Sequence, residues 1–434
     1  MRKWKTLFPC LLILVLICVL LPIPTHAVGT CGENATWYIY QGRMTISGTG
    51  QISVTDFAPW NSARNTVREV VIEPGITAID AETFRNFVAM TTVTLPDGLE
   101  IIGDYAFSGC GMLQNITLPE SVEIIGANAF SGCTKLSQLN LPAGITGIGA
   151  SAFARTRLTS MTLPESITVI PDSLFSGCTK LEQVTLSPNT TAIGKYAFLD
   201  CSQLTEIHLP TSLQRIDDAA FHGCRRLEAV YIEDLHHWFT VEFHDNPLEN
   251  QAKLFVDGIQ LTELVVPDGI THVPARSFAG CVGLVRVTIP NTVTSIGSQA
   301  FSTCPNLTTI YLTSSLQSLT GFENCPRIQK VYYDGSLQQF QEYKIGAEFA
   351  NAELFLTTQG TVDTLSQFSK SLSKLMEELT ELFHTWKPQL INLLLFGVTL
   401  DVVLLVVVLG IVFLIRRKAR QHKVKKRLNQ KYPK

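Results

Sequence analysis

Apolar and polar residues alternate in short stretches that return about every 23 residues along this chain. In one such stretch Leu113, Ile116 and Leu118 are separated by polar residues, and Pro119 then ends the alternation. This pattern predicts a short β-strand with one face in a core, because strand side chains alternate between faces and proline lacks the N–H donor. Phenylalanine marks the same period, at Phe84, Phe107, Phe130, Phe153, Phe175, Phe198, Phe221, Phe278 and Phe301.

A fixed period of this length is the signature of a solenoid, in which each repeat buries its apolar face by stacking on its neighbours. Within one repeat, Val122, Ile125, Ala129 and Phe130 are expected to complete the core, and Gly126 to permit a tight bend. The predicted fold class is therefore an α/β-type repeat solenoid with short parallel strands. A β-rich cap is predicted before it, and a C-terminal helix and a single transmembrane helix after it.

The repeated phrase L-P-x-x-Φ-x-x-I-G-x-x-A-F-x-x-C, in which Φ is apolar, resembles the BspA-like leucine-rich repeat of microbial surface proteins. Cys31-Gly32, Trp37 and Ala58-Pro59-Trp60 are similar to the β-rich segment that often precedes these repeats. The stretch 233–260 resembles a family insertion with Trp238 as a core residue, and 331–356 resembles a degenerate second copy. The resemblance implies a leucine-rich repeat fold and an extracellular setting, and it names no ligand.

These patterns divide the chain into successive segments. They are a signal peptide 1–27, a β-rich N-terminal cap 28–66, leucine-rich repeats 67–232, an insertion 233–260, further repeats 261–332, a C-terminal cap 333–360, an amphipathic heptad stalk 361–388, a transmembrane helix 389–415 and a basic cytosolic tail 416–434. The signal peptide is predicted from a basic start, an apolar run and the small-residue site at Thr25-His26-Ala27. An uncleaved anchor is the alternative.

The apolar run 390–415 is long enough to cross a bilayer, and ten Lys and Arg residues without an acid follow it. The positive-inside rule then places the tail in the cytosol and the repeats outside, in a single-pass cell-membrane protein. Of 34 basic residues, three lie in the signal and ten in the tail, which leaves 21 outside against 36 of the 37 acids. The predicted ectodomain thus has a formal net charge near −15, which argues against a nucleic-acid partner.

Two features near the membrane predict partners. Apolar residues spaced three and four apart over 365–386 favour a coiled coil that joins copies as a homo-oligomer, and the alternative is a helix lying on the bilayer or on the end of the solenoid. Asp401 lies within the apolar run, where a charge is costly. We expect Asp401 to contact a polar group of a partner in the membrane, and the alternative is a tolerated residue.

Cysteine recurs at the end of the repeat, at Cys110, Cys133, Cys178, Cys201, Cys224, Cys281, Cys304 and Cys325. Equivalent positions predict a ladder of buried small side chains, and the alternative is disulfides between stacked coils. His236, His237, His244 and Asp245 form the one local cluster of metal-competent residue types, and their spacing fits no ligand pattern. We therefore predict no metal and no cofactor, and the chain lacks the G-x-S-x-G, H-E-x-x-H and P-loop motifs of enzymes.

The outward strand positions are the candidate ligand-binding residues. They are Thr117, Thr162, Thr185, His208, Tyr231, Tyr311 and Tyr332, within an outward row that also holds Thr94, Asn140 and Thr288. Hydroxyls and amides beside aromatic platforms suit glycans or extended peptides, and tyrosine often anchors interfaces. The alternative is that threonine and tyrosine simply favour strands.

The predicted function is adhesion or recognition of an extracellular protein or glycan by a non-catalytic surface of a membrane-anchored protein. A first alternative is a structural or assembly component of a membrane complex, joined through the stalk and the transmembrane helix. A second is an enzyme hidden in the insertion.

Overall fold

The computed structural model describes residues 27–53, 58–343, 349 and 351–357. Nearly all of the predicted signal peptide and the whole of the predicted stalk, transmembrane helix, Asp401 and basic tail lie outside these residues. Among the helices within them, none has the length and apolar character needed to span a bilayer.

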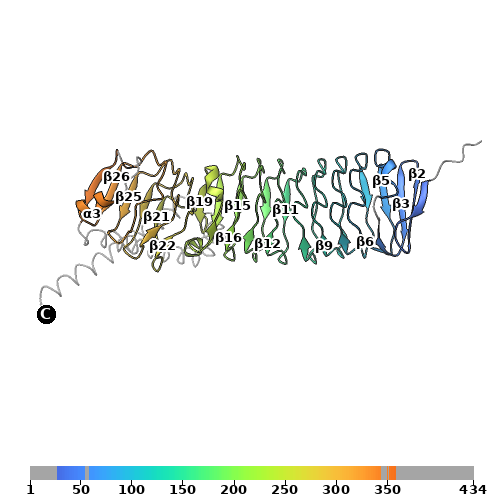
Figure 1. Cartoon of the computed structure of the whole chain (residues 1–434), viewed down its shortest axis with the longest axis horizontal. Coiled ribbons are helices and arrows are strands. Elements are labelled where there is room, and N and C mark those ends of the chain that lie inside the picture. Colours follow the sequence, from blue (N-terminus) through green and yellow to red (C-terminus); the bar gives the residue numbers. More distant parts are fainter. Residues whose placement is uncertain (1–26, 54–57, 344–348, 350, 358–434) are drawn as a thin grey trace, which may run out of the picture. The chain divides into compact units, whose positions relative to one another are not determined.

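The described chain winds into a β-solenoid whose coils stack along one long axis (Figure 1). One layer of parallel strands holds β5 (Glu69–Ile72), β7 (Thr92–Thr94), β11 (Ser160–Thr162), β13 (Gln183–Thr185), β15 (Glu206–His208), β17 (Ala229–Ile232), β19 (Lys253–Val256), β21 (Glu263–Val265), β23 (Arg286–Thr288), β25 (Thr309–Leu312), β26 (Lys330–Tyr333) and β27 (Glu353–Leu356). Single bridges continue this layer through Asn115 and Gln138. The parallel solenoid with its 23-residue period is thus confirmed.

A second layer of shorter strands lies on another side of each coil. It holds β6 (Ile76–Ile79), β8 (Ile101–Ile102), β9 (Ile124–Ile125), β10 (Gly147–Ile148), β12 (Val169–Ile170), β14 (Ala192–Ile193), β16 (Arg215–Ile216), β18 (Glu242–Phe243), β22 (His272–Val273) and β24 (Ser295–Ile296). Adjacent strands pair in register, so Thr162 lies beside Thr185 in the first layer and Ile170 lies beside Ile193 in the second. Equivalent residues of neighbouring coils therefore form rows along the solenoid.

The return segment of each regular coil consists of turns, where an α/β-type repeat would carry a helix. Each such segment holds two left-handed residues, for example Asn128 at φ 54° and Gly132 at φ 75°. A right-handed helix cannot pass through these positions. The α/β part of the predicted fold class is therefore corrected: the described helices are short, and the α-helices among them are α2 (Leu235–Trp238) and α3 (Leu337–Glu342).

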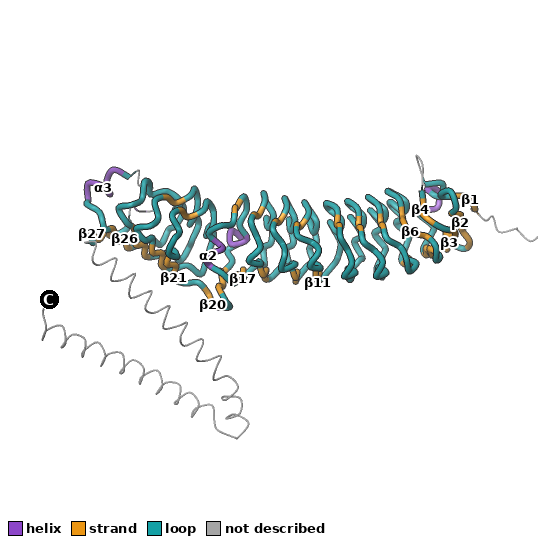
Figure 2. The backbone as a smooth tube through the Cα atoms, turned by 90° about the horizontal axis from the view of Figure 1, so that it is seen from below, coloured by secondary structure: helices purple, strands orange, loops and turns teal. Residues whose placement is uncertain are grey.

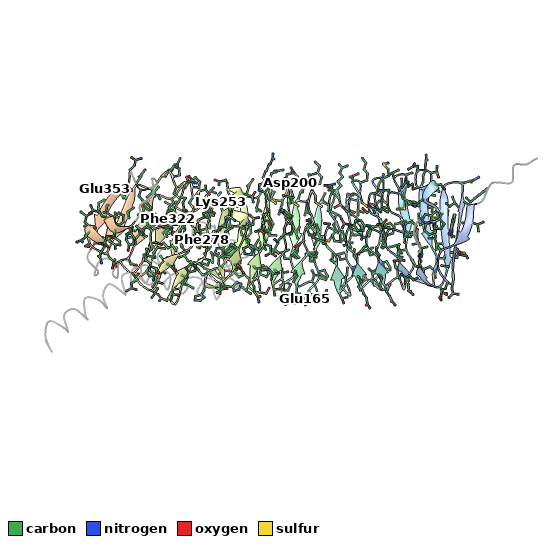
Figure 3. The ribbon with its side chains drawn as sticks, viewed as in Figure 1. Glu165, Asp200, Lys253, Phe278, Phe322 and Glu353 are labelled. Atoms are coloured by element: carbon green, nitrogen blue, oxygen red, sulfur yellow. The ribbon has the colours of Figure 1, made fainter. Side chains whose placement is uncertain are left out.

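The phenylalanines form a stacked column in the core, which runs from Phe84 to Phe221 and, after the insertion, from Phe278 to Phe322. Phe107 and Phe130 lie 5.4 Å apart with nearly parallel rings, and Phe130 and Phe153 lie 6.1 Å apart. Phe278 and Phe322, labelled in Figure 3, stack on the two sides of Phe301, and both are fully buried. Dispersion and apolar burial along this column hold neighbouring coils together.

A cap of antiparallel strands closes the N-terminal end of the column. β1 (Ala27–Thr30), β2 (Ala35–Tyr40) and β3 (Arg43–Gly48) pair in turn, and β3 then pairs in parallel with β5. Trp60 stacks on Phe84 with centroids 6.1 Å apart, and Trp37 meets Trp60 edge-on at 5.4 Å. The predicted β-rich head thus covers an end that would otherwise expose apolar rings. β4 (Gly50–Ile52) extends the second layer onto this cap.

Gly126 has a different role from the predicted one. Its φ is not left-handed, so the turn itself does not require glycine. A Cβ atom at Gly126 would instead lie 2.5 Å from the Asp104 nitrogen and 2.6 Å from the Gly103 carbonyl carbon. The repeated glycine is needed because the backbones of adjacent coils approach closely there.

The end-of-repeat cysteines form the predicted buried ladder, and no disulfide joins the described cysteines. Seven of the eight thiols, all except that of Cys281, donate to the carbonyl of a phenylalanine in the preceding coil, as Cys133 Sγ does to Phe107 O at 3.2 Å. In the coil that lacks cysteine, the buried Thr156 lies at this position, and its hydroxyl donates instead to Phe153 O of its own coil, at 2.9 Å. Burial raises the pKa of Cys110 and Cys224 to about 12 and that of Cys178 to about 11.

These raised pKa values predict thiols that do not react while the solenoid is folded, because the thiolate is the nucleophile. When the full chain is treated with iodoacetamide at pH 8, we expect the ladder cysteines to stay unmodified in native buffer and to be alkylated fully in denaturant. Mass spectrometry of the tryptic peptides measures this. Complete alkylation of Cys133 in native buffer would show that the ladder is open to solvent.

Candidate ligand-binding face

The predicted candidate residues lie on one face of the first strand layer, hereafter the strand face. Thr117, Thr162, Thr185 and His208 are exposed, and the three tyrosines are half-buried. Figure 2 shows β11, β17, β21 and β26, which belong to this layer, along the same side of the solenoid. One expected member of the outward row differs: Thr288 is only 9% exposed, so it offers little surface to a ligand.

The first aromatic ladder on this face consists of His208, Tyr231 and Phe255. In-register pairing of β15, β17 and β19 places the three residues side by side on neighbouring strands. The rings of His208 and Tyr231 stack with centroids 4.4 Å apart, and those of Tyr231 and Phe255 with centroids 4.9 Å apart. Glu206 lies 3.9 Å from the His208 imidazole.

The second aromatic ladder consists of Tyr311, Tyr332 and Phe355, on β25, β26 and β27. Its rings are nearly parallel, with centroids 4.6 Å apart for Tyr311 and Tyr332 and 4.8 Å apart for Tyr332 and Phe355. Burial raises the pKa of the Tyr311 hydroxyl above its ordinary value, while the nearby Arg286 lowers it. Its hydroxyl is therefore a neutral donor and acceptor at physiological pH.

Sequence reasoning missed Phe255 and Phe355, the last residue of each ladder. Both lie in stretches that break the regular repeat phrase, and that phrase is what predicts the other strand positions. The signal was present, because Phe355 follows Tyr332 by the repeat period of 23 residues and Phe255 follows Tyr231 by 24. Both also sit between apolar residues, as outward strand residues do.

Stacking changes what the tyrosines offer to a ligand. Tyr231 has His208 on one ring face and Phe255 on the other, and Tyr332 lies in the same way between Tyr311 and Phe355. The expected aromatic platforms are therefore covered at these two positions. Ring edges and hydroxyls remain for contact.

Charged residues of both signs border the ladders. Figure 3 marks Lys253 and Glu353, which lie two positions before Phe255 and Phe355 on their strands. Lys330 takes the same place beside Tyr332 and is exposed. Arg286 and Glu263, farther along this row beyond Thr309, form an exposed ion pair at 3.0 Å. The surroundings of the ladders are mixed, in contrast to the acidic balance of the predicted ectodomain.

Two of the three histidines of the insertion make side-chain contacts within the solenoid. His237 Nε2 lies 2.7 Å from Leu213 O, and His244 Nε2 lies 3.1 Å from Glu242. Asp245 accepts the backbone N–H of Phe221 at 2.7 Å, and burial raises the pKa of its carboxyl. Across the described part of the chain, no three His, Cys, Asp or Glu side chains are grouped as metal ligands would be.

The insertion itself packs as the resemblance implied. Trp238 is buried, and its indole N–H donates to Ser277 O at 2.9 Å. A small hollow beside it, lined in part by Leu209, Leu213 and His237, has a volume of about 10 Å³. That volume is at most the room that one water molecule needs, so the hollow is too small for an organic substrate.

The sequence matches the family described as the BspA type leucine rich repeat region, over residues 62–182, 146–253 and 249–357. The chain belongs to this family. The BspA-type repeats thus account for both regular stretches of the solenoid and for the insertion between them. The family description names a repeat region and no reaction.

Several solved structures of bacterial proteins are similar to this BspA-type chain. One is a leucine rich cell surface protein from Faecalibacterium prausnitzii, with 20% identity over 74% of this chain and 98% of the other, and a TM-score of 0.39. A leucine-rich repeat protein from Bacteroides ovatus has 22% identity over 75% and 99%, with a TM-score of 0.40. The pneumococcal vaccine antigen PcpA has 18% identity over 79% and 96%, with a TM-score of 0.39. No curated protein matches the chain.

Proposed function

We propose that this BspA-type protein is a membrane-anchored surface protein that recognises an extracellular macromolecule through its strand face, without catalysis. The observation that carries the proposal is the pair of aromatic ladders on that face. A soluble solenoid can fill its outward strand positions with threonine, as the coils at Thr117, Thr162 and Thr185 do. Six aromatic side chains concentrated in two places call for a further explanation, and tyrosine is a frequent interface anchor.

Anchoring in the membrane is the second part of the proposal. It rests on the apolar run 390–415 and on the basic residues that follow it. With this topology the solenoid lies outside the cell, where a rigid surface can meet a macromolecular ligand. Homo-oligomerisation through 365–386 and a membrane contact of Asp401 would add avidity or a partner to the same arrangement.

Replacing the tyrosines of the strand face by threonine tests the proposal. Threonine is the residue that regular coils carry at the same position, so Tyr231→Thr, Tyr311→Thr and Tyr332→Thr together are expected to preserve the fold. We expect the full chain in lipid nanodiscs to bind spots of an array of extracellular-matrix proteins and glycans. The triple variant should bind at least about 100-fold more weakly, because the loss of even one hot-spot residue costs about 2 kcal/mol or more.

Tyr196→Asn is the matched control, because Tyr196 is 45% exposed and lies in a return segment, away from the strand face, and because asparagine tolerates its left-handed φ of 58°. Binding by this variant should equal that of the unchanged chain. Full binding by the triple variant would contradict the strand face as the recognition surface and would favour an assembly role for the segment 361–401.

A further inference from the structure

Both aromatic ladders are made by the same structural element, present twice. In each copy a strand with a tyrosine, β17 or β26, leads into a short helix, α2 or α3, and a later strand with a phenylalanine, β19 or β27, returns to the layer beside it. In the first copy β18 and the short 3-10 helix Pro247–Asn250 lie between α2 and β19. In each copy the phenylalanine pairs in register with the tyrosine and stacks on it. Each copy also extends a ladder that begins one strand earlier, at His208 or at Tyr311.

The packing of the rings restricts the class of ligand. A sugar ring binds an aromatic side chain by laying its C–H groups on an open ring face. Both faces of Tyr231 and both faces of Tyr332 are occupied by neighbours whose centroids lie 4.4 to 4.9 Å away. The central ring of each ladder therefore cannot serve as a platform for a sugar.

The exposed parts of the ladders suit a protein surface. The edge of an aromatic ring carries partial positive charge and attracts carbonyl oxygens and the faces of other aromatic rings, both of which protein surfaces supply. Stacking also holds each side chain in one orientation before a partner arrives, so binding costs less conformational entropy.

The charged residues that border the ladders also favour a protein ligand. Glu206 and Lys253 border the first ladder, and Lys330 and Glu353 border the second. An apolar centre within a rim of both signs is typical of a protein interface. A polyanionic glycan would instead require an excess of basic residues on this face.

We propose that the two ladders are two like contact points for an extracellular protein, which engages their ring edges and tyrosine hydroxyls, and that they are not glycan sites. This inference rests on the proposed function and specifies its ligand class. Because both ladders lie on one rigid solenoid, a partner that touches both gains avidity. Loss of one ladder should then lower the apparent affinity by about 100-fold, and loss of both should abolish binding.

The test uses the full chain in nanodiscs, with purified extracellular-matrix proteins arrayed before and after enzymatic deglycosylation, beside an array of free glycans. One variant removes the first ladder by Tyr231→Thr with Phe255→Thr, a second removes the second ladder by Tyr332→Thr with Phe355→Thr, and a third combines them. Tyr231→Phe with Tyr332→Phe keeps the stacks and removes two hydroxyls, so it covers the case in which a threonine variant fails to fold.

We expect binding to matrix proteins that survives deglycosylation, falls about 100-fold in either single-ladder variant and disappears in the combined variant. The Phe variant should bind several-fold more weakly with the fold intact. Binding to free glycans alone, or binding abolished by deglycosylation, would overturn the inference of a protein ligand. Neither result would contradict recognition by the strand face. Binding to neither array would contradict the proposed function, and the inference with it.

Discussion

Replacing Phe130 by alanine should lower the stability of the coils around it by about 3–5 kcal/mol, the usual range for a large aromatic side chain removed from a core. Phe130 is fully buried and stacks on Phe107 and Phe153, at 5.4 and 6.1 Å. The variant loses the apolar burial of the ring and leaves a cavity between two neighbours that cannot close it without bending the stack.

Native-state hydrogen exchange of the full chain is the appropriate measurement, because repeat proteins open locally and one global free energy does not describe them. Protection should fall in the coils that contain Phe107, Phe130 and Phe153 and remain unchanged near Phe301. Ile124→Ala is the control in the same coil, since Ile124 is 42% exposed, and it should cost about 1 kcal/mol or less. Equal effects of the two variants would contradict the phenylalanine column as the main contact between coils.

Replacing Gly126 by alanine should destabilise the same region by about 1–3 kcal/mol, as overpacking does. The added methyl group meets backbone atoms of the preceding coil at 2.5–2.6 Å, and backbone atoms cannot move aside as a flexible side chain can. The two coils must separate or tilt to admit it, which weakens the hydrogen bond from Gly126 N–H to Ile102 O.

Gly144→Ala separates this effect from the general effect of losing a glycine. Gly144 also has no left-handed φ, and the nearest atom to its added Cβ is Glu120 O at 3.8 Å. This substitution should be neutral or stabilise by up to about 1 kcal/mol, because alanine lowers the entropy of the unfolded chain. Thermal unfolding followed by circular dichroism compares the two variants. If Gly126→Ala were as stable as Gly144→Ala, close approach of the coils would not explain the repeated glycine.

The regular part of the fold could be predicted from the sequence because one rule recurs in every coil. The alternation of apolar and polar residues around Ile116 and Leu118 predicts which side chains are buried in the strand. The 23-residue recurrence of Phe130 and Cys133 predicts the same for the return segment. The irregular part could not be predicted in the same way. Phe255 and Phe355 follow short helices of variable length, so their place in the strand layer depends on how those helices fold.

The structural role of a residue was also harder to predict than its position in the coil. Gly126 was expected from its residue type to shape a turn, whereas its role depends on a neighbouring coil about 23 residues away in sequence. The same holds for Tyr231 and Tyr332, whose outward direction follows from alternation. That their ring faces are covered follows only from the stacking of three neighbouring strands.

Hydroxyl-radical footprinting of the full chain, alone and with the matrix protein that binds it most tightly, tests recognition by the strand face most directly. Mass spectrometry reports the oxidation of each tyrosine. The account predicts that Tyr231, Tyr311 and Tyr332 become protected on binding, while Tyr196, in a return segment, is oxidised equally in both samples. Protection of Tyr196 with unchanged oxidation of the three strand-face tyrosines would contradict it.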